Sequence, residues 1–411
     1  MVTEKLTEEH LNREEIKIAI YSDWWYPDSI GGAENSARNT LMKFSNHFPE
    51  NFQFHVFTIR NRSQEKYLMN DRHYLHRVKM LTFRRKAEVT LSIKILERIR
   101  LTLDIISPFI IAKKIISYQP KIIVVHNLDR CGPMLIHFLK KLSPESKIIR
   151  VFHDAGDTCE KRSRFFLGKV CQTTCKLCIP RLKIHKLIMK NVDTSIFVSQ
   201  YLQNKLIGLG FKSHNFKVGY PLNSIKQKLE FDDNLAFNRD KIVIGYLGRI
   251  SREKGISVLV EALTLLGKTK KVSLIIYGNG SKAYKDNILR KLNFNQIEVQ
   301  FNSASSEALQ KLKNCVDVIV VPSLWEEPFG KVPFEAISKV RVPVISSNSG
   351  GLVESSKFIK NNLHFFKSGD SSDLAETIKK LKVTREEEIC INEEDTLDFQ
   401  MKRSLEMYLN Y

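Results

Sequence analysis

Short runs of β-branched and other apolar residues recur along the chain, and polar, helix-forming stretches separate most of them. A strand inside a parallel sheet is buried on both faces, so its residues do not alternate between apolar and polar. In the first half of the chain this pattern predicts strands at residues 16–21, 53–58, 78–83, 121–126, 147–152 and 195–199. A helix is expected over residues 34–44. Alternating strands and helices of this kind predict an α/β domain with helices on both faces of its sheet.

A second series of strands and helices begins after a polar stretch at residues 218–240, which we interpret as a linker. Its strands are predicted at residues 242–247, 272–277, 316–321 and 342–347, with a weaker edge strand near 363–366. The fold class predicted is therefore α/β, with two tandem Rossmann-like domains, parallel sheets and a cleft between them. We expect an N-terminal domain at 1–222, a C-terminal domain at 223–396, and a final helix at 397–411 that packs back on the N-terminal domain.

The composition fits a folded chain and excludes several other classes. Of the 411 residues, 43% are hydrophobic and 27% are charged, which is enough apolar material to offset the entropy of the chain. No apolar stretch approaches the ~20 residues that a membrane-spanning helix needs. The first fifteen residues are polar and acidic, unlike a secretory signal. We therefore expect a cytoplasmic protein.

The loops that follow the strands of the second domain carry side chains suited to a phosphate-bearing ligand. Ligands of parallel α/β sheets bind at the carboxyl ends of the strands. After residues 242–247 comes Gly248-Arg249-Ile250-Ser251-Arg252-Glu253-Lys254. An arginine fork, a lysine charge and the N–H groups of a helix start can together hold a diphosphate without a metal ion. A basic surface loop is the alternative interpretation.

Two later loops extend this pattern. Gly278-Asn279-Gly280 follows the next strand, but Ala283 stands where a dinucleotide-binding fingerprint needs a third glycine. Taken alone, this loop is better interpreted as a plain turn from strand to helix. The loop after residues 316–321 holds Glu327, and Glu335 falls on the following helix. Backbone N–H groups would be exposed at the start of that helix, at Phe329, Gly330, Lys331 and Val332. A carboxylate beyond them could bind sugar hydroxyls, and one on the helix could bind a ribose.

These motifs, in this order, resemble those of the retaining GT-B glycosyltransferases of group 1, family 4. Glu327 and Glu335 match the Glu-x7-Glu pair of that family, and residues 350–354 match its Gly-Gly-x-x-Glu turn. In the N-terminal half, Gly31-Gly32-Ala33-Glu34 resembles the Gly-Gly-x-Glu loop of the family. His153 stands where the family keeps a histidine that faces the donor. The resemblance spans residues 16–354.

The resemblance implies transfer of a sugar, with retained anomeric configuration, from a nucleotide-sugar donor to a glycan or lipid-linked acceptor. Such enzymes build lipopolysaccharide, capsule or exopolysaccharide. The implied mechanism is a front-side displacement that needs no metal cofactor, and the Asp-x-Asp triplet of metal-dependent GT-A enzymes does not occur in this sequence. Arg249, Lys254 and the N–H groups named above would stabilise the departing diphosphate. Glu327 and His153 would contact the donor sugar and Glu335 the ribose, while Gly31, Gly32 and Gly278 are also assigned to the donor site.

The sequence departs from the family pattern after Glu335. The stretch from there to Pro343 is one residue longer than usual, and it lacks the glycine that the family has two residues before this proline. We therefore expect an altered turn after the helix of Glu335. The family's Asn-Gly-Val-Asp linker turn is also replaced, here by residues 219–223, which affects the hinge and not the chemistry.

Four cysteines lie close together in a predicted insertion at residues 153–181, namely Cys159, Cys171, Cys175 and Cys178. In a reducing compartment they are expected to be thiols or metal ligands and not disulfides. Four thiolates suit a structural Zn²⁺, although a single Cys-x2-Cys is only half of the usual knuckle pattern. Some group 1 glycosyltransferases carry a similar insertion. Four unliganded thiols are the alternative.

The chain is strongly basic, with 65 Lys and Arg against 45 Asp and Glu and a formal net charge of +20. Such a charge favours anionic partners. Residues 84–86 are Arg-Arg-Lys, and residues 91–118 mix Ile and Leu with Lys94, Arg98, Lys113 and Lys114. This apolar and basic region predicts peripheral binding at an anionic membrane surface, the inner face of the cytoplasmic membrane. A core helix with a solvated basic face is the alternative.

Two other functions compete with a glycosyltransferase. A nucleotide-sugar epimerase would share the fold but not the combination of Arg249 and Lys254 with Glu327 and Glu335. A zinc-dependent nucleic-acid-binding protein would explain the charge and the cysteines. It would need basic residues interleaved with aromatic ones on one face, whereas the basic residues here are spread along the chain. We therefore expect no nucleic-acid partner.

Overall fold

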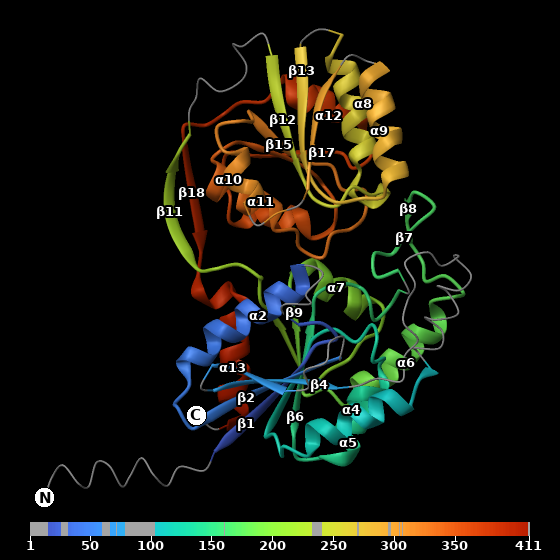
Figure 1. Ribbon diagram of the computed structural model, residues 1–411, viewed down its shortest axis with the longest axis vertical. Coiled ribbons are helices and arrows are strands. Elements are labelled where there is room, and N and C mark those ends of the chain that lie inside the picture. The colour runs from blue at the N-terminus through green and yellow to red at the C-terminus, as the bar shows by residue number, and fades with distance from the viewer. Residues whose placement is uncertain are drawn as a thin grey trace, which may run out of the picture.

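Two β-sheets, one above the other, form the cores of two α/β domains in the computed structural model (Figure 1). The structure describes residues 15–25, 32–59, 66–70, 72–78, 103–159, 161–231, 241–268, 271–294, 297–303, 305 and 307–409. The predicted fold class, two tandem Rossmann-like domains with parallel sheets, is confirmed.

The sheet of the N-terminal domain has eight strands in the order β10-β9-β6-β5-β1-β2-β4-β3, and all neighbours are parallel except β3 and β4. The strands are β1 (Ile16–Tyr21), β2 (Phe52–Ile59), β3 (Lys66–Asn70), β4 (His73–Val78), β5 (Ile122–Val125), β6 (Lys147–Phe152), β9 (Thr194–Phe197) and β10 (Asn215–Val218). Every residue of β5 is completely buried, as expected for a strand covered on both faces.

The sheet of the C-terminal domain has six parallel strands in the order β14-β13-β12-β15-β16-β17. They are β12 (Lys241–Leu247), β13 (Lys271–Tyr277), β14 (Glu298–Asn302), β15 (Val318–Val321), β16 (Val344–Ser347) and β17 (Leu363–Phe366). The chain builds outward from β12 through β13 to β14 and then returns to place β15 on the other side of β12. The loops after β12 and β15 therefore diverge at a topological switch point, where α/β sheets bind their ligands.

Helices and short turns connect the strands. The helices associated with the N-terminal sheet are α2 (Gly32–Phe44), α4 (Ile106–Ile116), α5 (Met134–Leu142), α6 (Ile179–Met189), α7 (Gln200–Gly208) and α13 (Leu397–Leu409). Those of the C-terminal domain are α8 (Ile256–Leu266), α9 (Lys282–Phe294), α10 (Ala308–Leu312), α11 (Val332–Glu335) and α12 (Ser371–Lys379). Short helical turns occur at η1 (Ser45–His47), η2 (Arg252–Lys254), η3 (Ala336–Val340), η4 (Gly350–Lys357) and η5 (Glu393–Asp395).

Two segments of the structure were not predicted as strands. One is β4, which ends at Val78, the first residue of the strand predicted at residues 78–83, and the rest of that predicted strand lies outside the described residues. The polar linker contains a strand, β11 (Ile225–Glu230), which pairs antiparallel with β18 (Glu386–Ile391). The sequence did not predict this two-stranded ribbon, because its exposed Lys and Glu side chains give it the composition of a linker. In the structure, the backbone N–H and carbonyl groups of the two strands bond to each other.

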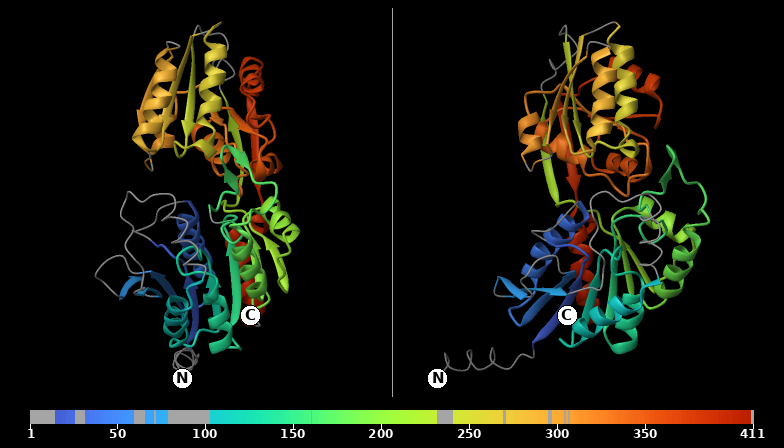
Figure 2. Two further views of the ribbon diagram at one scale, coloured as in Figure 1. Left: turned by 90° about the vertical axis from the view of Figure 1, so that its right-hand side faces the viewer. Right: turned by 45° about the vertical axis from the view of Figure 1, so that its right-hand side comes forward.

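The chain crosses between the two domains twice, and the two crossings are bonded to each other. The N–H of Tyr220 donates to the carbonyl of Asp395 at 2.8 Å, and the N–H of Leu397 donates to the carbonyl of Tyr220 at 2.8 Å. After the second crossing, α13 lies in the N-terminal lobe in both views of Figure 2, where it packs against α2, β9 and β10. The hydroxyl groups of Tyr408 on α13 and Thr194 on β9 are 2.6 Å apart.

Candidate active site

The loops singled out in the C-terminal domain converge at the carboxyl edge of its sheet. They follow β12, β13, β15 and β16, and backbone hydrogen bonds join them. The N–H of Ile250 donates to the carbonyl of Asn279 at 2.8 Å, and the N–H of Leu324 donates to the carbonyl of Glu253 at 2.9 Å. The N–H of Gly351 donates to the carbonyl of Glu327 at 2.7 Å. The convergence follows from parallel strands ending at one edge. We call this assembly the donor loops.

Lys254 and Glu327 form an ion pair at the centre of the donor loops, with 2.5 Å between Nζ and Oε1. The hydroxyl of Ser323 donates to the same carboxylate oxygen at 2.6 Å. Burial by itself would raise the pKa of Glu327, but Lys254 and the hydrogen bonds outweigh it and hold that pKa below its ordinary value. Sequence reasoning gave these two residues separate roles and did not predict their contact.

Arg249 lies to one side of this pair. Its side chain is 67% exposed and sits 3.5 Å from the Glu253 carboxylate. A pocket of about 640 Å³ opens beside it, at the carboxyl ends of β12 and β13, and its lining includes Arg249, Arg252, Asn279, Gly280, Ser281 and Tyr284. The pocket is open to solvent, and its lining is largely polar and includes two arginines.

Two of the assigned glycines are required by close packing. A Cβ at Gly278 would lie 2.0 Å from the carbonyl oxygen of Gly248, which only glycine permits. Gly330 has a φ of +85°, and a Cβ there would lie 2.4 Å from the side chain of Leu352. Both glycines therefore let the donor loops pack on one another, which is a structural reason for their presence.

The remaining assigned residues of this domain lie at the start of α11. Phe329 is buried and contacts Phe334, with ring centroids 5.7 Å apart. Burial lowers the pKa of Lys331, and the neighbouring Glu335 carboxylate partly restores it. Val332 is the first residue of the helix. The segment thus places a desolvated lysine and a carboxylate side by side.

The altered turn expected after Glu335 takes the form of a π-helical turn. Over η3 the backbone bonds span five residues, and the N–H of Arg341 donates to the carbonyl of Ala336 at 3.0 Å. A π-turn accommodates one extra residue within a helix. Arg341, the position at which the family has glycine, adopts a left-handed φ of +62°. The insertion is therefore absorbed locally and leaves Glu335 on the helix.

On the N-terminal domain, His153 follows β6 and pairs with His126, which follows β5, at 2.9 Å between ring nitrogens. Burial is the main cause that lowers the pKa of both histidines, to about 3 for His153. The charge of Lys331, from the C-terminal domain, contributes to the lowered pKa of His153. Gly32 is the exposed first residue of α2, and Gly31 lies outside the described residues.

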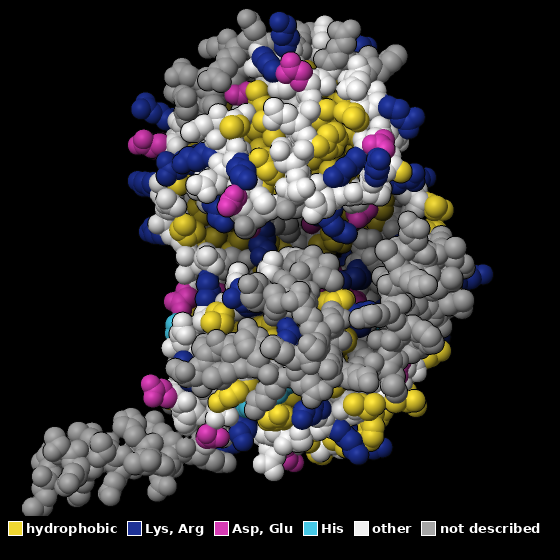
Figure 3. Space-filling model, viewed as in Figure 1, with side chains coloured by type: hydrophobic (Ala, Val, Ile, Leu, Met, Phe, Trp, Pro, Cys, Tyr) yellow, Lys and Arg dark blue, Asp and Glu magenta, His cyan; other side chains and the backbone are white. Residues whose placement is uncertain are grey.

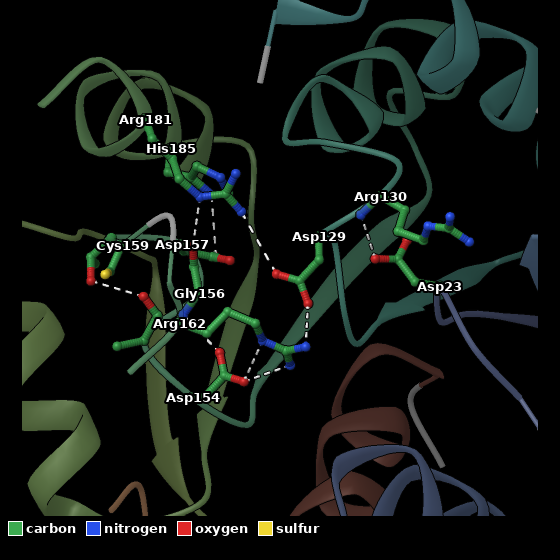
Figure 4. A network of polar contacts seen from close by, with 12 residues as sticks. Asp23, Asp129, Arg130, Asp154, Gly156, Asp157, Cys159, Arg162, Arg181 and His185 are labelled. Carbon is green, nitrogen blue, oxygen red and sulfur yellow. Dashed lines mark hydrogen bonds and ion pairs between the residues drawn. The ribbon is translucent and has the colours of Figure 1, made fainter. Parts of the chain in front are cut away.

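Sequence reasoning missed a network of charged residues next to His153 (Figure 4). Arg162 reaches the carboxylates of Asp129, at 2.7 Å, and Asp154, at 2.6 Å. Nearby, Arg150 forms an ion pair with the buried Asp157 at 2.9 Å. The position of Asp129 and Asp154, just after β5 and β6, is the signal that could have found them. The network ties the Cys-containing insertion to the edge of the sheet.

The four cysteines of the insertion differ in exposure. Cys159 and Cys178 are buried, Cys171 is half-buried and Cys175 is exposed. The thiol of Cys159 accepts a bond from the N–H of Lys161 at 3.4 Å. Within the described part of the chain, no group of three or more His, Cys, Asp or Glu side chains is arranged to hold a metal ion. The zinc hypothesis therefore stays a prediction.

The comparisons with known proteins agree with this geometry. Residues 227–393 match the family model of glycosyl transferases group 1. A capsular polysaccharide biosynthesis glycosyltransferase of Staphylococcus aureus is 30% identical over 48% of this chain and 49% of its own. A lipopolysaccharide 1,2-N-acetylglucosaminetransferase of Salmonella typhimurium is 23% identical over 59% of each chain. The chain spans about half the length of the curated relatives it matches first.

Solved structures show the fold. A sucrose-phosphate synthase of Thermosynechococcus elongatus superposes with a TM-score of 0.64 at 18% identity, covering 89% of both chains. Anabaena HepE, solved in complex with UDP and glucose, superposes with a TM-score of 0.58 at 17% identity and also covers 89% of both chains. This chain has the two-domain GT-B fold of these structures, and residues 227–393 of its C-terminal domain are similar to glycosyl transferases group 1.

Proposed function

We propose that this protein is a retaining, metal-independent glycosyltransferase that moves a sugar from a nucleotide-sugar donor to a glycan or lipid-linked acceptor in cell-surface polysaccharide biosynthesis. The observation that carries the proposal is the Lys254–Glu327 pair, held at the topological switch point of a group 1 domain. Relatives named for capsule and lipopolysaccharide synthesis support the pathway class, and a similar fold solved with UDP and glucose supports the donor class.

The residues have distinct roles in this proposal. Breaking the bond between sugar and phosphate develops negative charge on the departing diphosphate and positive charge on the anomeric carbon. Lys254, Arg249 and the N–H groups of residues 329–332 stabilise the diphosphate. Glu327 holds the sugar hydroxyls and Glu335 the ribose. His153, neutral near pH 7 because of its lowered pKa, offers the donor sugar a hydrogen bond without a charge.

The proposal extends to the acceptor and the mechanism. The acceptor enters from the N-terminal domain, beside Asp129 and Asp154, whose carboxylates suit sugar hydroxyls. A phosphate oxygen of the leaving group takes the acceptor proton as the new bond forms on the same face of the sugar. The configuration at the anomeric carbon is therefore kept.

The experiment is a screen of nucleotide sugars, first by thermal shift and then by transfer assay. A donor that binds the native state raises the melting temperature. The product's anomeric configuration is read by NMR, and the assay is repeated with EDTA. We expect retention and undiminished transfer in EDTA. Anomeric inversion would refute the retaining assignment, and an absolute need for Mg²⁺ or Mn²⁺ would refute metal independence.

We also propose that the protein binds an anionic membrane surface through α4. Ile105, which precedes α4, and Ile106, its first residue, are 57% and 58% exposed, and Phe109 and Ile110 on the helix are partly exposed. Figure 3 shows yellow and dark blue side chains together at the lower right of the N-terminal lobe, and the last turn of α4 carries Lys113 and Lys114. Residues 84–86 and 91–102 of the predicted region lie outside the described residues. No helix in the described ranges is long and apolar enough to span a membrane.

Vesicle flotation tests this surface. The wild type should float with phosphatidylglycerol vesicles and stay behind with phosphatidylcholine vesicles, because lysines need anionic headgroups. Ile105→Asp with Ile106→Asp should abolish flotation. Leu265→Asp, at a partly exposed apolar position of α8 in the other domain, is the control. Equal flotation of all three proteins would contradict the proposal.

A further inference from the structure

Glu354 joins the two domains through a single carboxylate. It belongs to η4 of the C-terminal domain, and its side chain is 10% exposed. The carboxylate accepts hydrogen bonds from the N–H groups of Gln200, at 3.0 Å, and Tyr201, both in the first turn of α7 in the N-terminal domain. It also accepts a bond at 2.8 Å from the hydroxyl of Tyr220, on the first crossing between the domains. One side chain thus contacts a helix and the hinge.

The start of α7 is well suited to a carboxylate from outside its own domain. The first N–H groups of a helix have no partner within the helix, and the helix dipole favours negative charge there. Ser199, the N-cap, already accepts the N–H of Leu202 at 3.0 Å. Glu354 accepts hydrogen bonds from the two N–H groups before Leu202, those of Gln200 and Tyr201. Charge-assisted bonds of this kind are stronger than neutral ones, so the contact resists separation of the domains.

Residues of α7 and its N-cap also form polar contacts with the donor loops. The hydroxyl of Ser199 donates to the carbonyl of Pro328. Lys205, one turn further along α7, forms an ion pair with Glu326 at 2.6 Å. These partners flank Glu327. Because η4 is itself bonded to Glu327 through the N–H of Gly351, α7, η4 and the donor loops form one connected unit across the domain boundary.

We infer that Glu354 is a positioning residue that fixes the angle between the two domains, so that the donor loops face His153. The inference rests on the proposed glycosyltransferase function. Glu354 is not assigned a contact with the donor. It acts through α7 and Tyr220, which set where the N-terminal domain presents the acceptor. A displacement of about 1 Å between reacting groups can cost ~10²-fold in rate, so a loosened angle should reduce transfer without weakening donor binding.

The chain offers a matched control for Glu354. Glu387 is also a buried carboxylate that accepts backbone N–H bonds, from Lys360 at 2.9 Å, Asn361 at 3.0 Å and Asn362 at 2.6 Å. All of these residues belong to the C-terminal domain. Glu354→Gln and Glu387→Gln therefore remove the same kind of contact, but only the first removes it between the domains.

The experiment compares the two variants with the wild type by small-angle X-ray scattering, by titration with UDP, GDP and ADP, and by transfer assay. For Glu354→Gln we expect a larger radius of gyration and turnover lower by ~10²-fold, with nucleotide affinity unchanged. For Glu387→Gln we expect a lower melting temperature with scattering and turnover like those of the wild type. Tyr220→Phe, which removes only the hydroxyl, should show a smaller change of the same kind and decides the matter if Glu354→Gln fails to fold.

Two results would overturn the inference. One is wild-type scattering and turnover in Glu354→Gln, or in Tyr220→Phe if Glu354→Gln does not fold. The other is an equal change of scattering in Glu387→Gln, which would mean that general destabilisation and not the domain contact is responsible. If the wild type transfers sugar from no donor, the proposed function fails, whereas the scattering comparison still decides the role of Glu354.

Discussion

Lys254 and Glu327 are 73 residues apart in the sequence, yet their charged groups are in contact at 2.5 Å inside the donor loops. The lysine also lies 5.3 Å from the centre of the Trp325 ring. Each charge is therefore the counter-ion of the other before a donor binds. A buried ion pair that loses one partner leaves an uncompensated charge behind. The two residues should consequently behave as a unit in mutagenesis.

We expect Lys254→Ala to lower turnover by ~10²–10³, the usual cost of removing one group that stabilises developing charge. Glu327→Ala should be comparably severe. Because the residues form a unit, the double variant should be no slower than the worse single variant. Steady-state kinetics on the four proteins measures this. Unchanged turnover in Lys254→Ala would refute the site, and additive losses would refute the coupling.

Glu335→Ala should raise the KM for the donor more than it lowers kcat. The ribose is remote from the bond that breaks, so this contact is the same in the ground state and in the transition state. Glu376→Ala is the control, because Glu376 is an exposed carboxylate on α12 that pairs with Lys380 at 3.3 Å. A fall in kcat with an unchanged KM would place Glu335 at the reacting centre instead.

Stability should fall as the pH drops below about 6.5, the ordinary pKa of histidine in an unfolded chain. In the folded protein the pKa of His153 is lowered to about 3 and that of His126 is also lowered, mainly by burial. Between these two pKa values the unfolded state therefore binds more protons than the folded state. As the pH falls, each histidine lowers the free energy of unfolding by at most about 1.4 kcal/mol per pH unit. Melting curves from pH 4 to 8 measure the slope, and His153→Asn should flatten it. An identical slope in this variant would show that other groups are responsible.

Reduced, purified protein should contain about one Zn²⁺ per chain if Cys159, Cys171, Cys175 and Cys178 form a structural site, because four thiolates complete the tetrahedral coordination of one zinc ion. Elemental analysis measures the metal. Cys159→Ser should lose the metal and lower the melting temperature before it affects turnover. Cys315→Ser, at an exposed thiol of the other domain, should do neither. Protein that is free of metal after such a preparation would count against the site.

Arg341→Gly should stabilise the protein by about 1 kcal/mol, because a left-handed φ is unfavourable for a residue with a Cβ and neutral for glycine. Urea denaturation measures the difference. Arg341→Ala keeps the Cβ and should bring no gain, so it separates backbone strain from loss of the arginine charge. A gain of equal size in both variants would point to the charge.

The accuracy of sequence prediction differed between kinds of strand. Fully buried strands such as β15 and β16 were located to within about two residues, because a strand covered on both faces must be apolar throughout. The strand β4 was not predicted, since its sequence HYLHRV contains polar histidines. In the structure His55 and His76 stack on each other, with ring centroids 5.2 Å apart, so the fold buries side chains that composition alone assigns to a surface.

The sequence by itself determined the two parallel-sheet domains and the residue types of the donor loops, because apolar runs and glycine-rich turns are local properties of the chain. The tertiary structure alone decided the contacts. Strand order places β15 directly beside β12, and this brings Glu327 to Lys254. The packing of two domains brings Glu354 to the start of α7. The partner of a carboxylate cannot be predicted from the sequence around it. That partner depends on which loops lie side by side once strands distant in sequence become neighbours in the sheet.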